Sequence, residues 1–191
     1  VIDKPLPDLL GRPVELLSNI NEPSEIPLAQ KYHTDGVGLF RTEFSFIAKE
    51  TFLSEEEQFN LYRKVIDAFP GKEITIRALD LGGDKFLPFS NLQHPENNPF
   101  LGWRSIRVLL SETEIFKTQL RAIYRAATAG DVRIMIPMIS SREELIEARH
   151  ICTSVQEGLS REGIPFRKNL PFGIMVEVPS TAIMIDSLIK E

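Results

Sequence analysis

The sequence contains one cysteine, Cys152, and no long apolar run. A single cysteine excludes a disulfide within the chain. No stretch approaches the roughly 20 apolar residues that a helix needs to span a bilayer. The first residues also lack the charged and then apolar segments of a secretory signal. We therefore expect a cytoplasmic protein that does not insert into a membrane.

A block of lysines and arginines is also missing. The 191 residues include 22 basic and 27 acidic side chains, which gives a formal net charge of −5. Nucleic acids and anionic membrane surfaces attract proteins with basic patches. Neither is therefore expected as the main partner, although a small anion could still bind at a local basic site.

Short apolar runs alternate with segments of helical spacing along the whole chain. The runs have the length of strands, and they are Val14–Ile20, Gly36–Phe40, Ile74–Leu79, Arg133–Met138 and Phe172–Val178. This alternation predicts an α/β fold with a parallel sheet, because each helix returns the chain to the same end of the sheet. Parallel strands of a closed barrel and of a doubly wound sheet look alike in sequence, so the pattern leaves both open.

Serine followed three residues later by glutamate is typical of a helix start, because the two side chains satisfy each other's backbone donors. The pairs are Ser54 and Glu57, Ser111 and Glu114, and Ser141 and Glu144. Residues 80–104, rich in glycine, proline and asparagine, are predicted to form a folded loop. Residues 180–191 are predicted to form a helix that reaches the end of the chain without a stop signal, which leads us to expect a fragment of a longer protein.

Three charged residues fall at the carboxyl ends of predicted strands, where parallel α/β folds bind their ligands. They are Arg41, Arg77 and Glu177. A buried charge costs several kcal/mol unless it is paired, so each of these residues needs a partner. One interpretation is structural, with Arg41 paired to Glu43 and Arg77 to Asp80. The other is a binding site, and three such residues at one edge favour the site.

The same residues indicate what kind of ligand would bind. A guanidinium group matches phosphate and carboxylate oxygens in a bidentate manner, so two arginines suggest a ligand with two anionic groups. Glu177 would repel that ligand unless a divalent cation lies between them. Mg²⁺ suits this role, since it binds one or two carboxylates together with substrate phosphates.

Five strings, in this order and at these separations, resemble enzyme I of the bacterial phosphoenolpyruvate-dependent phosphotransferase system. They are GVGLFRTEF, IRALDLGGDKFLP, NPFLGWRSIR, RIMIPM and GIMVEVP, and the resemblance runs from about Val14 to the last residue. It implies a TIM-type (β/α)8 barrel, of which residues 1–191 would supply about the first five βα units. The phosphohistidine domain and the last barrel units would be absent.

The resemblance also implies roles for particular residues. Arg41 and Arg77 would bind phosphoenolpyruvate, Glu177 would be one of two carboxylate ligands of Mg²⁺, and this part of the protein would hold no catalytic residue. Candidate supporting residues are Thr42, Asp80 and Arg104.

The family reaction passes a phosphoryl group from phosphoenolpyruvate to an enzyme histidine and then to a histidine-containing phosphocarrier protein. The full-length protein is expected to be a homodimeric phosphotransferase serving sugar transport or nitrogen regulation. The chain alone is expected to be inactive. The alternative function is that of a non-catalytic module that binds a phosphorylated metabolite.

Overall fold

The computed structural model of the chain describes residues 6–7, 10–49, 51–82 and 102–191. Within these residues, five parallel strands form one sheet in the order in which they occur along the chain. They are β3 (Leu17–Ile20), β4 (Gly36–Arg41), β5 (Glu73–Arg77), β6 (Asp131–Ile136) and β7 (Phe172–Ile174). Two short strands, β1 (Leu6–Pro7) and β2 (Pro13–Val14), form an antiparallel pair before the sheet. The predicted α/β fold with a parallel sheet is confirmed.

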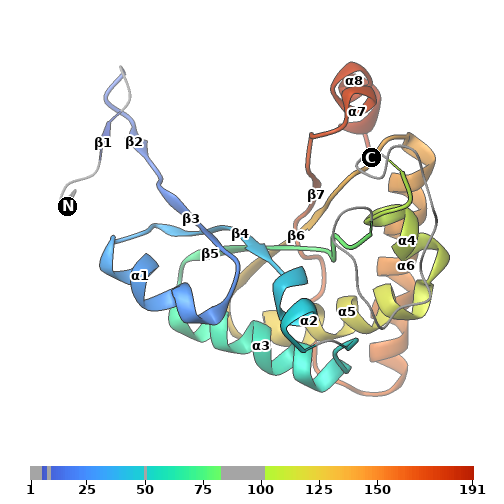
Figure 1. The fold of residues 1–191 in the computed structure, drawn as a ribbon, viewed down its shortest axis with the longest axis horizontal. Helices are drawn as coiled ribbons and strands as arrows, with labels where there is room; N and C mark the ends of the chain where they lie inside the picture. The colour runs from blue at the N-terminus through green and yellow to red at the C-terminus, as the bar shows by residue number, and fades with distance from the viewer. Residues whose placement is uncertain (1–5, 8–9, 50, 83–101) are drawn as a thin grey trace.

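Helices connect the strands, and several of them lie along one side of the sheet, as Figure 1 shows for α1, α3 and α5. The α-helices are α1 (Ile26–Lys31), α2 (Glu43–Lys49), α3 (Glu55–Ala68), α4 (Ile106–Ser111), α5 (Thr113–Ala126), α6 (Arg142–Arg161), α7 (Pro179–Ile183) and α8 (Ile185–Leu188). Two 3₁₀ turns, η1 (Pro23–Glu25) and η2 (Ala127–Ala129), complete the described elements. No helix in the described ranges is long and apolar enough to cross a membrane.

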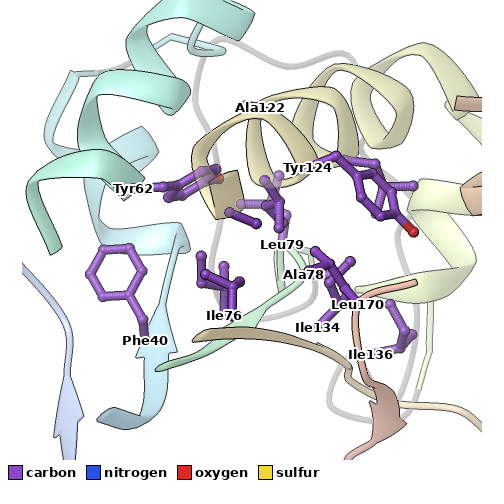
Figure 2. Close-up of a cluster of buried hydrophobic side chains, with 14 of the residues drawn as sticks. Phe40, Tyr62, Ile76, Ala78, Leu79, Ala122, Tyr124, Ile134, Ile136 and Leu170 are labelled. Atoms are coloured by element: carbon purple, nitrogen blue, oxygen red, sulfur yellow. The ribbon is translucent and has the colours of Figure 1, made fainter. Parts of the chain in front are cut away.

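The core lies between the sheet and these helices. Val132, Ile134 and Ile136 alternate along β6 and are all buried, whereas Arg133 between them is exposed. Figure 2 shows part of this core, with Phe40 and Ile76 from neighbouring strands below the helix that carries Ala122. A strand with period-two burial packs one face on the core, and this face is the one toward the helices.

The two glycines of GVGLFRTEF let β4 fit closely between its neighbours. A Cβ atom on Gly36 would lie 2.5 Å from the carbonyl oxygen of Glu73 in β5. A Cβ atom on Gly38 would lie 2.8 Å from the Cβ atom of Leu17 in β3. Both distances are too short for ordinary contacts, so any larger residue at either position would push the strands apart.

Two of the three predicted helix starts are confirmed. Ser54 caps α3 and Ser141 caps α6, each in a reciprocal capping box with the glutamate three residues on. The prediction for Ser111 is wrong, because Ser111 is the last residue of α4 and α5 follows after Glu112 without a side-chain cap.

The strand predictions differ from the structure mainly at their ends. The run Val14–Ile20 divides between β2 and β3. β7 stops at Ile174, earlier than predicted. Met175 still donates to Ile136, but the next N–H toward β7, that of Met138, donates to the Glu177 side chain instead of a strand carbonyl. The predicted terminal helix is broken at Met184 into α7 and α8. Most of the predicted loop at 80–104 lies outside the described residues.

Cys152 lies in the buried face of α6, and desolvation raises the pKa of its thiol to about 11 from 9.0. The thiol of the unfolded chain therefore ionises first as the pH rises. We expect the free energy of unfolding to fall by about 2–3 kcal/mol between about pH 9 and pH 11 because of this residue. Urea unfolding over this pH range should show a smaller fall for Cys152→Ala than for the wild type. Parallel pH profiles for the two proteins would refute the assignment.

Candidate phosphate-binding site at the carboxyl edge of the sheet

Arg41 and Arg77 lie side by side at the carboxyl edge of the sheet. Arg41 is the last residue of β4, Arg77 is the last residue of β5, and the two are register partners. Register partners in neighbouring strands project to the same face. The structure therefore places both predicted arginines together, on the face opposite the buried residues of β6.

Glu43, the first residue of α2, connects the two arginines. Its Oε1 atom lies 3.1 Å from Arg41 Nε and 2.5 Å from the Arg77 guanidinium. The Glu43 side chain is fully buried, that of Arg77 is 6% exposed and that of Arg41 is 27% exposed. The guanidinium of Arg41 also lies over the ring of Phe44, 4.9 Å from its centroid. Of the two arginines, Arg41 is thus the one that solvent and a ligand reach more readily.

Asp80 extends this network beyond β5. Its carboxylate lies 3.3 Å from the Arg77 guanidinium and accepts two hydrogen bonds of 3.1 Å from the Arg104 guanidinium. Arg104 in turn forms a backbone bridge with Gly82, so the segments after β5 and before α4 are held together here. Both ion pairs expected from the structural interpretation, Arg41 with Glu43 and Arg77 with Asp80, are therefore present.

The five charged side chains of this network alternate in sign along it, arginine with carboxylate. In addition, the buried Nε atom of Arg77 has no hydrogen-bond partner within the described residues. An unsatisfied buried donor costs roughly 1–3 kcal/mol. An anion that accepted a hydrogen bond there would remove this cost. The pairing of the arginines is thus compatible with anion binding.

Thr42, a predicted supporting residue, is fully buried, and its side chain contacts the backbone of Arg77. Its hydroxyl donates to the carbonyl oxygen of Arg77 (3.1 Å) and accepts from the amide of Gln119 (3.1 Å). The Gln119 amide also donates to the hydroxyl of Tyr62, which donates to Gln58. Burial raises the pKa of Tyr62 above its ordinary value, so its hydroxyl stays protonated.

Glu177 lies three residues beyond β7 and is exposed. Its Oε1 atom accepts a hydrogen bond from the backbone N–H of Met138, which follows β6, over 2.9 Å. Met138 has a φ of 58°, which is unusual for a residue with a side chain. Met175, two residues before Glu177, places its sulfur 3.8 Å from the Arg77 guanidinium. The segment that carries Glu177 therefore contacts Arg77.

The described residues offer only part of a magnesium site. No group of three or more histidine, cysteine, aspartate or glutamate side chains in the described ranges is arranged to hold a metal ion. Mg²⁺ does not need such a group, since it keeps several waters and is often shared between one or two carboxylates and a substrate phosphate. The exposed carboxylate of Glu177 fits the role of one such ligand.

Sequence reasoning missed two features of this site. It considered Glu43 only as a structural partner of Arg41, although this carboxylate is the central acceptor between two arginines. It did not find Gln119, whose contact with Thr42 joins residues 77 positions apart. The sequence does place Gln119 among the apolar positions of α5, which indicates that its side chain is buried. That pattern does not indicate which residues the side chain bonds to.

Comparison with known proteins shows which family the chain resembles. The family described as PEP-utilising enzyme, PEP-binding domain, matches residues 2–191. The phosphoenolpyruvate-protein phosphotransferase of Staphylococcus carnosus is 42% identical over 181 residues, which are 95% of this chain and 31% of the relative. That of Bacillus subtilis is 41% identical over 191 residues, 100% of this chain and 33% of the relative. That of Priestia megaterium is 42% identical over 178 residues, 93% of this chain and 31% of the relative.

The chain thus spans about a third of the length of the curated relatives that it matches. The resemblance inferred from the five strings is confirmed by these relatives. With the family match covering nearly every residue, the chain belongs to the PEP-utilising enzymes, within their PEP-binding domain.

Proposed function

We propose that this chain is the phosphoenolpyruvate-binding part of a phosphoenolpyruvate-protein phosphotransferase, and that Arg41 and Arg77 hold the substrate. The observation that carries the proposal is the register pairing of the two arginines at the ends of β4 and β5. Phosphoenolpyruvate has a phosphate and a carboxylate, and two adjacent guanidinium groups can bind both in a bidentate manner. The names of the relatives support the same ligand.

We also propose that the sheet is part of a (β/α)8 barrel, with about five of its βα units in this chain. Two observations support a barrel over a doubly wound sheet. The strands follow one another in sequence order, whereas a doubly wound sheet reverses its order at a switch point. The face of the sheet that carries Arg133 and Met135 is partly exposed in the described residues, as expected if further strands complete an interior.

The chemistry at this edge would be electrostatic. Phosphoryl transfer spreads negative charge over the equatorial oxygens of the phosphoryl group, so fixed positive charges stabilise the transition state. Arg77 is suited to this because it is buried and held by two carboxylates. Arg41, which is more exposed, would meet the substrate first. Thr42, Asp80 and Arg104 would support the arginines without touching the reacting atoms.

Magnesium, when bound, would neutralise phosphate oxygens that otherwise repel Glu177. This carboxylate is exposed at the same edge of the sheet and is oriented by the Met138 amide. We therefore assign Glu177 as one Mg²⁺ ligand of the proposed site.

Replacing Glu177 with glutamine is expected to reduce the dependence of phosphoenolpyruvate affinity on Mg²⁺. Without Mg²⁺, loss of the repelling carboxylate should leave the affinity unchanged or raise it. With Mg²⁺, loss of a charged ligand should weaken binding by roughly tenfold, in line with the weight of one charge-assisted contact. Calorimetric titration of the full-length protein with and without Mg²⁺ measures both effects. Glu147→Gln, at an exposed position of α6, is the control. An unchanged Mg²⁺ effect in Glu177→Gln would rule out this ligand assignment.

For the whole protein we propose the remaining parts of the family reaction. The phosphoryl group would pass to a histidine outside this chain and then to a histidine-containing phosphocarrier protein. The protein would act in the cytoplasm as a homodimer. The chain by itself would not transfer phosphoryl groups, because none of its three histidines lies in a motif that matches the phosphorylated histidine of the family.

A further inference from the structure

Gln119 of α5 is a buried amide with three hydrogen bonds to three different segments. Its side chain is enclosed in the core, where the residue is only 1% exposed. Its Nε2 atom donates to the hydroxyl groups of Thr42 and Tyr62, each over 3.1 Å. Its Oε1 atom accepts from the backbone N–H of Leu79 over 2.9 Å. One side chain therefore joins the end of β4, the end of β5 and helix α3.

These bonds take over where the backbone ladder between β4 and β5 stops. The last register pair is Arg41 with Arg77. Beyond it, the Thr42 hydroxyl donates to the carbonyl oxygen of Arg77, and the Gln119 amide accepts from Leu79. The backbone on either side of Ala78 is thus held by side chains, while Ala78 itself donates to Met135 in β6. After β4 turns away into helix α2, the backbone at the end of β5 is therefore still hydrogen-bonded, through the side chains of Thr42 and Gln119.

These bonds also fix the position of Glu43, the first residue of α2. Thr42 directly precedes Glu43, whose Oε1 atom bonds to both arginines. Figure 2 shows Tyr62 beside Phe40, with its hydroxyl directed toward the helix that carries Ala122. Since Thr42 is held by Gln119, and Gln119 by Tyr62, the position of the Glu43 carboxylate depends on the amide of Gln119.

We propose that Gln119 is a positioning residue of the phosphoenolpyruvate site: it fixes the ends of β4 and β5 so that Arg41 and Arg77 meet the two anionic groups of the substrate. The inference rests on the proposed function. Gln119 itself touches no substrate and acts through Thr42 and Leu79. A buried amide is costly to desolvate, and an apolar side chain would fill the same space in this core at no such cost. The need to hold the strand ends explains why an amide occupies it.

The test is Gln119→Met in the full-length protein, which keeps the length of the side chain and removes all three hydrogen bonds. Misplacing a binding group by about 1 Å can cost up to a hundredfold, so we expect KM for phosphoenolpyruvate to rise by roughly tenfold or more. Ile123→Ala, one turn further along α5 at a fully buried position, is the control for stability. It should lower Tm at least as much as Gln119→Met and leave KM unchanged.

This comparison separates positioning from stability alone, because loss of folded enzyme lowers the apparent kcat but does not change KM. Tyr62→Phe provides a second variant should Gln119→Met fail to fold. It removes one bond to Gln119 and is expected to raise KM by about two- to fivefold. A wild-type KM in the folded variants would overturn the inference. The proposed function has its own test in Arg77→Ala: if that variant binds phosphoenolpyruvate normally the function fails, whatever Gln119 does.

Discussion

Replacing Glu43 with glutamine is expected to lower the free energy of unfolding by about 3–5 kcal/mol, the usual cost of breaking a buried ion pair from one side. The fully buried carboxylate accepts from Arg41 and from Arg77 through the same oxygen. A neutral amide has a similar shape but cannot compensate either guanidinium group. Arg77, only 6% exposed, would keep Asp80 as its one carboxylate partner among the described residues.

Glu55→Gln is a closely matched control. Glu55 also pairs with two arginines, Arg121 and Arg125, but these side chains lie at the outer surface of α3 and α5 and are 21–24% exposed. Both partners of each Glu55 pair are reached by solvent, and such pairs contribute little, so the loss should be about 1 kcal/mol or less per pair. Urea unfolding of the two variants measures the difference directly. Equal losses would show that burial of Glu43 does not make its ion pairs special.

Replacing Arg77 with alanine is expected to weaken phosphoenolpyruvate binding by about 100-fold or more in the full-length protein. Two hydrogen bonds from a charged donor contribute roughly 1.5–3 kcal/mol each, which gives this range. Arg77→Lys should recover only part of the affinity, because an ammonium group keeps the charge but not the planar pair of donors. Calorimetric titration with Mg²⁺ present gives the affinity of each variant.

Arg133→Ala is the control for Arg77→Ala. Arg133 projects from β6 to the same face of the sheet, two residues before the register partner of Arg77, and it pairs with Glu73. It is an arginine of the same sheet, but it lies away from the carboxyl edge. Its removal should leave phosphoenolpyruvate affinity unchanged. Similar losses in both variants would mean that the charge of the sheet face, rather than the Arg77 contact, governs binding.

The positions of the strands could be predicted because each is a short apolar run between helical segments, and β4, β5 and β6 lie within two residues of the predicted ends. The ends were less predictable, since they depend on neighbours. β7 stops where the Met138 N–H donates to the Glu177 side chain and not to the ladder, and Ser111 fails as a cap because two helices adjoin there. Neither cause is visible in the segment itself.

The site also has features that the sequence could predict and features that it could not. Arg41 and Arg77 could be placed together because the carboxyl ends of neighbouring parallel strands meet at one edge. Their sharing of Glu43 could not, because the turn from β4 into α2 decides where that carboxylate points. The link from Gln119 to Thr42 and Leu79 depends on how α5 packs across the sheet, and that is a tertiary property.

The central claim is that Arg41 and Arg77 together hold phosphoenolpyruvate at the carboxyl edge of the sheet. A crystal structure of the full-length protein with phosphoenolpyruvate and Mg²⁺ tests it most directly. We predict substrate oxygens within hydrogen-bond distance of both guanidinium groups, and the Glu177 carboxylate on the metal. Phosphoenolpyruvate bound elsewhere, with neither arginine in contact with it, would contradict the account.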